Sequence, residues 1–250
     1  MRDIIAGLVV FVCLLAASLG SRALYERVPK RHRTGETEHV VRLFASFFVV
    51  MTSLVISLML NQAKATLETA DKGVHAYAVQ LILFDRDLRH YGVTDTAAAR
   101  KSLLAYATQA AARMRQTDPT LSSGTAEALL RDTIEAVQLL APADDEHADL
   151  KLELERRFSK IYEMRWSLVE QSEGTVPAAL LVMVTLWLIL IFASYGFRAP
   201  PNRFVAASFV VSSALIGAVI YLILDMDVPF DGLIQVSPAP LERVVAELSR

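Results

Sequence analysis

Residues 40–60 have the sequence VVRLFASFFVVMTSLVISLML, in which Arg42, near the start, is the one charged residue. A helix needs about 20 predominantly apolar residues to cross the hydrocarbon core of a bilayer. Three further runs of this kind occur, at Ile4–Leu19, Val176–Tyr195 and Phe204–Leu224. The sequence therefore predicts an all-α membrane protein with four transmembrane helices.

The composition of the 250-residue chain narrows the class of function. Hydrophobic residues make up 54% of it and charged residues 21%, and the mean hydropathy is +0.38. A net charge of −2 gives no reason to expect a nucleic-acid partner. The single cysteine, Cys13, lies inside the first apolar run, which excludes a disulfide framework. Because the sequence has no nucleophile–base pair, glycine-rich phosphate loop or HExxH motif, we do not expect an enzyme.

The segment between the second and third spans predicts a bundle of helices. Leu67, Val74, Leu81 and Leu88 recur at intervals of seven, which is typical of helices that pack at a shallow angle. No proline separates this pattern from the second span. We therefore expect one long helix that leaves the membrane and ends at Gly92.

Three more helices are expected from the apolar pattern and the helix breakers. They run from Asp95 to Gln116, from Thr125 to just before Pro142, and from Asp144 to Glu173. Short connections between four helices predict an antiparallel four-helix bundle. The predicted domains are a transmembrane hairpin (1–61), the extramembrane bundle (62–175), a second transmembrane hairpin (176–224), and a C-terminal turn with a short amphipathic helix (225–250).

Lysine and arginine near the ends of the spans predict the orientation in the membrane. The loop between the first two spans is basic, and the short loop between the last two carries Arg198 and Arg203. The charge count therefore places both short loops in the cytoplasm and the bundle on the other side of the membrane.

The second span carries polar residues on one face. Ser46, Ser53, Ser57 and Asn61 follow at spacings of seven, four and four, and the stripe extends to Arg42 and Lys64. One interpretation is a water-lined path whose cationic ends attract anions. The other is that the serines let helices pack closely and bond to carbonyl groups. The residues alone leave both open.

Two smaller patterns concern packing. Ser213 and Gly217 in the fourth span have the small-xxx-small spacing of helix contacts. Arg165 falls on the apolar face of the last bundle helix, and a buried guanidinium needs a carboxylate. We predict an ion pair with Asp71 or Glu68, either as a structural clasp or as part of a charge ring at a pore mouth.

The sequence after the fourth span is acidic and turn-forming. Asp225, Asp227 and Asp231 could ligate calcium, or the turn could lock the end of the helix against its neighbours. Ser237 is placed to cap a short terminal helix.

Two segments resemble the bestrophin-like domain family of bacterial membrane proteins. They are LDMDVPFDGLIQVSPAPL, residues 224–241, and LFDRDLRHYG, residues 83–92, which is followed by Arg100. The arrangement of two spans, a helical insert and two spans also agrees with that family. The positions that carry the resemblance are Asp85, Tyr91, Gly92, Arg100, Asp227, Pro229, Phe230, Gly232 and Ser237.

The family is remotely similar to the bestrophins, which are pentameric anion channels with an aromatic neck on the second membrane helix. The resemblance implies that Phe44, Phe47 and Phe48 are the neck residues. It also implies a calcium clasp at the three aspartates after the fourth span. Because bestrophins keep their helical region in the cytoplasm, the resemblance implies an orientation opposite to the one that the charge count gives.

The expected function is an anion (chloride) channel in which the second span lines the pore. Its partners are the lipid bilayer, further copies of the chain in a homo-oligomer (five by the resemblance), and small anions. No cofactor other than calcium is expected. The alternative is a membrane-anchored helical sensor or partner-docking protein without transport activity.

Overall fold

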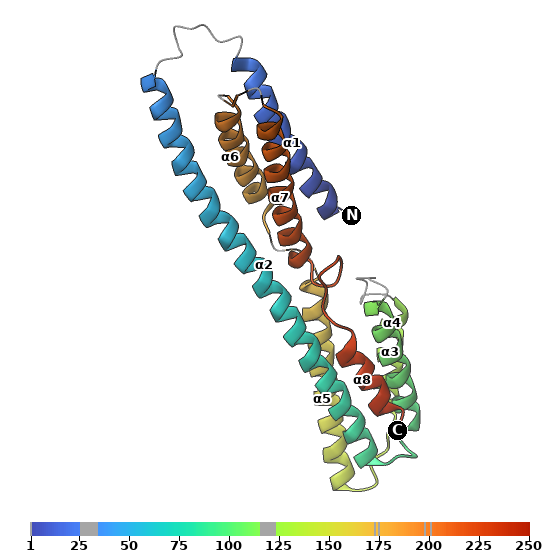
Figure 1. Cartoon of the computed structure of the whole chain (residues 1–250). Coiled ribbons are helices and arrows are strands. Elements are labelled where there is room, and N and C mark those ends of the chain that lie inside the picture. The colour runs from blue at the N-terminus through green and yellow to red at the C-terminus, as the bar shows by residue number, and fades with distance from the viewer. Residues whose placement is uncertain are drawn as a thin grey trace. The chain divides into compact units, whose positions relative to one another are not determined.

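The computed structural model describes residues 2–25, 35–115, 124–172, 174, 176–197, 199–200 and 202–250. For residues 2, 23–25 and 35–42 it describes the backbone alone. The described residues form helices and no strands (Figure 1). The helices are α1 (Arg2–Tyr25), α2 (Gly35–Tyr91), α3 (Ala97–Arg115), α4 (Gly124–Gln138), α5 (Asp145–Glu170), α6 (Ala178–Gly196), α7 (Arg203–Asp227) and α8 (Ala239–Leu248).

Four of these helices are long and apolar enough to cross a membrane. They are α1, the first part of α2, α6 and α7, and they coincide with the four predicted spans. The predicted all-α fold is therefore confirmed for the described residues, which include four candidate membrane spans.

The chain divides into two compact units. The membrane unit comprises Met1–Ala65 and Thr175–Asp227, and the bundle unit comprises Thr66–Gly174 and Val228–Arg250. Because α2 passes from one unit into the other, the long uninterrupted helix predicted from the sequence is present.

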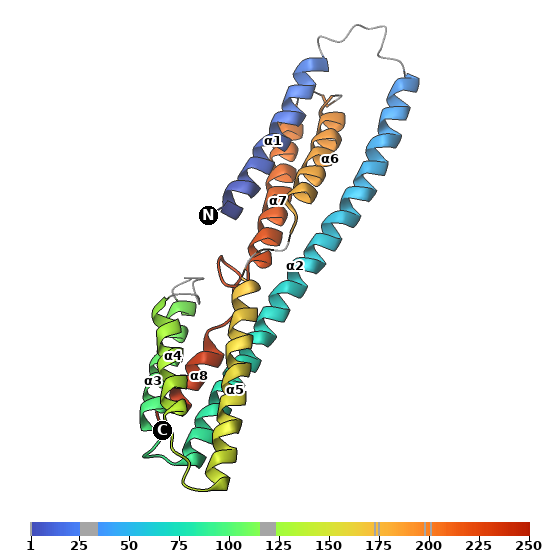
Figure 2. The ribbon, with the colours of Figure 1, turned by 180° about the vertical axis from the view of Figure 1, so that it is seen from behind.

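The membrane unit is organised around α1, which packs against both α6 and α7 (Figures 1 and 2). Its core contains Val10, Leu14, Val184, Leu188 and Ile220, each buried. Two contacts of α1 are made at the level of the backbone. A Cβ atom at Gly217 would lie 2.9 Å from the carbonyl oxygen of Gly7, and one at Gly196 would overlap the carbonyl oxygen of Ser18.

Small residues thus set the spacing of the membrane helices, because the close approach of backbones is the main source of attraction between helices in lipid. Ser213 and Gly217 are both buried, and Gly217 lies against α1. The predicted packing role of these two residues is confirmed.

The core of the bundle unit contains the residues of the heptad pattern. Val74, Leu81 and Leu88 are buried, and Leu67 packs against them in part. The C-terminal helix α8 joins the same core through Leu241, Val244 and Leu248. The structure therefore places residues 228–250 with the bundle, whereas the sequence predicted a separate C-terminal segment. α8 is a ten-residue amphipathic helix with apolar residues on one face. That face packs against the bundle, because its exposure to water would be unfavourable.

Specific local contacts end the helices of the bundle unit. At the end of α2, Gly92 adopts φ +153°, a conformation that favours glycine, as the predicted helix end requires. The Thr96 hydroxyl donates to the carbonyl oxygens of Leu88 and Gly92 at 2.9 and 2.8 Å. At the start of α5, Asp144 is the N-cap and accepts from the backbone N–H of His147.

Asp85 connects three parts of the bundle unit. Its buried carboxylate accepts from Nε of Arg89 at 2.7 Å and from Nε of Arg100, on α3, at 2.8 Å. Arg89 also donates to the carbonyl oxygen of Glu247, on α8. A further ion pair joins Arg115 of α3 to Glu242 of α8. The two motif residues Asp85 and Arg100 thus hold α2 and α3 together.

The glycine contact predicts a first stability effect. Gly217→Ala should destabilise the protein by about 1–3 kcal/mol, because the added methyl group meets backbone that cannot move aside alone. The measurement is thermal unfolding in detergent. The matched control is Gly20→Ala in α1, where nothing lies within 4 Å of the new Cβ. Equal melting temperatures for the two variants would contradict a backbone-level contact.

The Asp85 ion pairs predict a second effect. Asp85→Asn should cost about 1–3 kcal/mol, because two guanidinium groups lose their charged partner while keeping some access to water. Glu247→Gln is the control, since it removes an exposed ion pair with Arg250 and should change stability by less than about 0.5 kcal/mol. A destabilisation of Asp85→Asn no larger than that of the control would show that the network contributes little.

Candidate functional site

The exposed side of α2 in the membrane unit carries polar residues among large apolar ones such as Val50, Leu54 and Leu58. Five of the residues predicted to line a pore, here called the polar stripe, are all exposed: Ser46, Ser53, Ser57, Asn61 and Lys64. The opposite face, which includes Ala45, Thr52, Met59 and Ala63, is buried. The predicted residue Arg42 lies outside the residues whose side chains the structure describes.

One hydroxyl of the polar stripe is bonded within its own helix. The Ser57 Oγ donates to the carbonyl oxygen of Ser53 at 2.8 Å. This bond satisfies the donor and leaves the lone pairs of the hydroxyl oxygen available on the open face. The bond is compatible both with water beside the serine and with a serine that needs no further partner.

The aromatic residues of α2 divide between two environments. Phe44 and Phe47 are 61% and 60% exposed, on the open side of the helix. Phe48 packs against Trp187 of α6, with ring centroids 6.2 Å apart. Phe48 is half-buried through this contact with α6, and the three-residue aromatic neck stays a prediction. Trp187, in the middle of α6, is half-buried and faces Phe48 of α2.

Arg165 lies inside the bundle unit and is 1% exposed. Its guanidinium donates to the hydroxyl of Tyr106, which lies 2.6 Å from the hydroxyl of Tyr77. Burial raises the pKa of the Tyr106 hydroxyl above its ordinary value, so this group stays neutral. The two tyrosines were not predicted as partners, although Tyr77 stands within the heptad pattern of α2.

The carboxylates predicted to pair with Arg165 lie on an accessible part of α2. Glu68 is exposed, and the carboxylate of Asp71, 46% exposed, lies 3.5 Å from Nδ1 of His75. The ion pair of Arg165 with Asp71 or Glu68 stays a prediction.

The aspartates after the fourth span are held by protein groups. Asp225 accepts from the Tyr221 hydroxyl at 3.0 Å, and Asp227 accepts from the backbone N–H of Val176 at 2.9 Å. Asp231 is exposed. Among the described residues, no three His, Cys, Asp or Glu side chains gather closely enough to hold a metal ion. The contacts therefore do not favour the predicted calcium site, and they support the alternative of a turn that locks the helix end.

The turn itself is well formed. The backbone N–H of Val236 donates to the carbonyl oxygen of Pro229 at 2.9 Å, and Gly232 has φ +115°. Phe230 is buried in the core of the bundle unit. The Ser237 Oγ accepts from the backbone N–H of Ala239, but α8 begins one residue later than predicted, with Pro238 as its N-cap.

The fold is similar to two solved structures of a bacterial bestrophin homologue from Klebsiella pneumoniae. One is a point variant, with a TM-score of 0.67 and 12% identity over 99% of this chain and 98% of its own. The other has a TM-score of 0.67 and 15% identity over 98% and 96%. At this identity the similarity shows a shared fold. A search of curated proteins gives no match.

The resemblance predicted from the two motifs is confirmed by comparison with families. The structure places Asp85 and Arg100 in one ion-paired group and gives Gly92 and Gly232 the backbone angles that suit glycine. A family model described as the Bestrophin-like domain matches residues 12–241, and the chain therefore belongs to the Bestrophin-like domain family.

Proposed function

We propose that the protein is a homo-oligomeric anion channel of a bacterial inner membrane, in which α2 lines the pore. The observation that supports this proposal is the polar stripe on the open face of α2. Membership of the Bestrophin-like family and the fold shared with a bestrophin homologue support a channel as well.

The physical argument concerns what can stand beside the polar stripe. Hydroxyl, amide and ammonium groups are solvated better by water than by hydrocarbon, including groups that already have one partner within the protein. A ring of copies that turn their α2 helices towards a common axis gives these groups a water-filled path. Lys64 adds positive charge at one end of the stripe, which favours anions over cations. Phe44 and Phe47 then form the neck.

The number of copies in the ring is five if the assembly follows the bestrophins. For the orientation, the charge count and the similarity to bestrophins disagree. We place the bundle unit in the cytoplasm, because the chain shares both family and fold with that group.

The second candidate is a membrane-anchored helical protein that docks a partner. The bond from Ser57 to the Ser53 carbonyl favours it to some extent, because a serine bonded within its helix needs no water. The two candidates differ in the size of the particle. The channel requires a closed ring, and we expect light scattering or native mass spectrometry in detergent to give the mass of about five chains. A monomer or dimer would favour the docking protein, because neither encloses a pore.

Ion flux tests the role of the polar stripe. In liposomes containing the purified protein, we expect chloride flux that Ser53→Leu together with Ser57→Leu reduces by at least about tenfold. The reason is that an apolar lining raises the barrier to a hydrated ion, and about 1.4 kcal/mol corresponds to a factor of ten.

The control for this experiment is Ser212→Leu on α7, an exposed serine of a membrane helix outside the polar stripe. This variant should conduct like the wild type and form particles of the same mass. Flux that persists in the double variant would remove α2 from the pore. Equal loss in the control would show that the leucines act through folding.

A further inference from the structure

A titratable ring joins the start of α5 to the end of α2 at one end of the bundle unit (Figures 1 and 2). His147, in the first turn of α5, meets the ring of Tyr91 in a T-shaped contact, with ring centroids 5.2 Å apart and planes at 87°. Tyr91 is the last residue of α2 and is buried. The side chain of His147 is 34% exposed, so it exchanges protons with water while it touches both helices.

The imidazole of His147 is also bound to the N-cap of its own helix. Nδ1 of His147 lies 2.6 Å from Oδ1 of Asp144, and the backbone N–H of His147 donates to the same oxygen at 2.8 Å. Because an ionised carboxylate only accepts, Nδ1 carries a hydrogen. The bond holds the ring in its position on Tyr91. Protonation of the ring strengthens the bond, since charge-assisted hydrogen bonds are about twice as strong as neutral ones.

Carboxylates act on His147 from both sides of the contact. Asp144 and Glu146 belong to the start of α5, and Asp95 belongs to the turn after α2. The Asp95 carboxylate is turned back towards the end of α2, because a Cβ atom on Gly92 would lie 3.0 Å from its Oδ2. These carboxylates repel one another across the contact when the imidazole is neutral, and each attracts the imidazole when it is charged.

Basic residues of the neighbouring turns have partners of their own. Lys151, one turn further along α5, donates to two carbonyl oxygens at the end of α4. Arg157 of α5 pairs with Asp87 of α2, and Arg89 pairs with Asp85. The groups in these contacts ordinarily keep their charges between about pH 5 and 8. A change of pH within this range therefore reaches the contact of α5 with the end of α2 through the imidazole.

We propose that His147 is a proton-dependent latch. Its charged imidazole holds the start of α5 against the end of α2 and the turn that follows, and its neutral imidazole loosens this contact. The latch lies wholly within the bundle unit, so it is independent of whether the protein conducts ions.

The direction of the pH dependence follows from the ion pair. The bond with Asp144 raises the pKa of His147 above its ordinary value, and the charges of Asp144, Glu146 and Asp95 add to this effect against the partial desolvation of the ring. The contribution of the latch to stability is therefore fully present below about pH 6.5 and is lost as the pH rises through the raised pKa. The bond from the backbone N–H of His147 lowers the pKa of Asp144, so this carboxylate stays charged throughout that range.

The first measurement is the titration of His147 in the full-length protein in detergent. Deuterium exchange at the imidazole C2 position, followed by mass spectrometry, gives the pKa of each histidine. We expect Asp144→Asn to shift the titration of His147 to lower pH, because asparagine keeps an N-cap acceptor but removes the charge. Asp71→Asn is the matched control, since it removes a carboxylate beside His75 instead and should leave the titration of His147 unchanged.

The second measurement is amide hydrogen exchange in residues 91–97 and 144–150, corrected for the intrinsic effect of pH. Protection of these segments in the wild type should fall by up to about fivefold between pH 6 and pH 8, the range expected of a partly exposed ion pair. His147→Gln keeps a donor but no titratable group, and should show the lower protection at both pH values. The segment around Arg157 serves as the internal control, because its pair with Asp87 does not titrate in this range.

Three outcomes would overturn the latch. The first is a titration of His147 that Asp144→Asn leaves unchanged. The second is wild-type protection that is the same at pH 6 and pH 8, and the third is a pH dependence that persists in His147→Gln. Thermal unfolding checks each variant. If His147→Gln disturbs folding, Asp95→Asn replaces it, since this change keeps the ring contact and should weaken the pH dependence. An undiminished pH dependence in Asp95→Asn would likewise overturn the attraction between the two elements.

Discussion

The backbone-level packing of α1 against α6 and α7 is the constraint on which the membrane unit depends. Lipid does not drive apolar helices together, so contact must come from surfaces that approach closely. Gly196 and Gly217 supply such surfaces, since a side chain at either position would collide with the backbone of α1. The three helices form a core on which α2 needs to use only one face. Phe48 and Trp187 contribute to that contact, and the face of α2 that carries the polar stripe remains exposed.

In the bundle unit, buried polar groups place the helices relative to one another. Asp85 joins α2 to α3 through Arg100 and reaches α8 through Arg89. Arg165 of α5 joins Tyr106 of α3, whose hydroxyl contacts Tyr77 of α2. A buried charged or polar pair contributes little net stability to the fold. Removing one partner is nevertheless costly, because the other stays buried without a partner. The hydrophobic core therefore holds the helices together, and these polar contacts fix which positions of the helices face each other.

The sequence predicted those features that a local pattern determines. The four spans follow from runs of apolar residues, and the end of α2 follows from Gly92, which has the positive φ expected of a helix-ending glycine. The open face of the polar stripe follows from spacing along one helix. The contact between Arg165 and Tyr106 does not, because it depends on how helices distant in sequence are rotated. The same limit explains the contact of Phe48 with Trp187, which is more than a hundred residues away.

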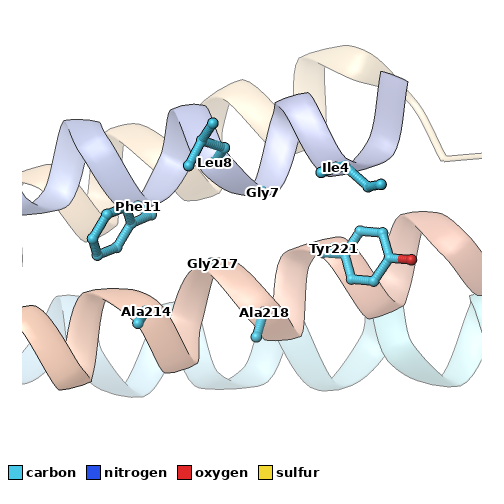
Figure 3. Close-up of a pocket in the computed structure, with 8 residues that line it drawn as sticks. All are labelled: Ile4, Gly7, Leu8, Phe11, Ala214, Gly217, Ala218 and Tyr221. Carbon is cyan, nitrogen blue, oxygen red and sulfur yellow. The ribbon is translucent and has the colours of Figure 1, made fainter. Parts of the chain in front are cut away.

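The membrane unit presents two surfaces of different chemistry to its surroundings. The exposed face of α2 carries the hydroxyl, amide and ammonium groups of the polar stripe among apolar side chains. Between α1 and α7 lies an apolar groove (Figure 3) in which Tyr221 has the one polar side chain among the lining residues, so water inside it would lack hydrogen-bond partners. The assembly that we propose for the channel fits this difference, because it turns the stripe towards a shared aqueous path and leaves apolar surface to the bilayer.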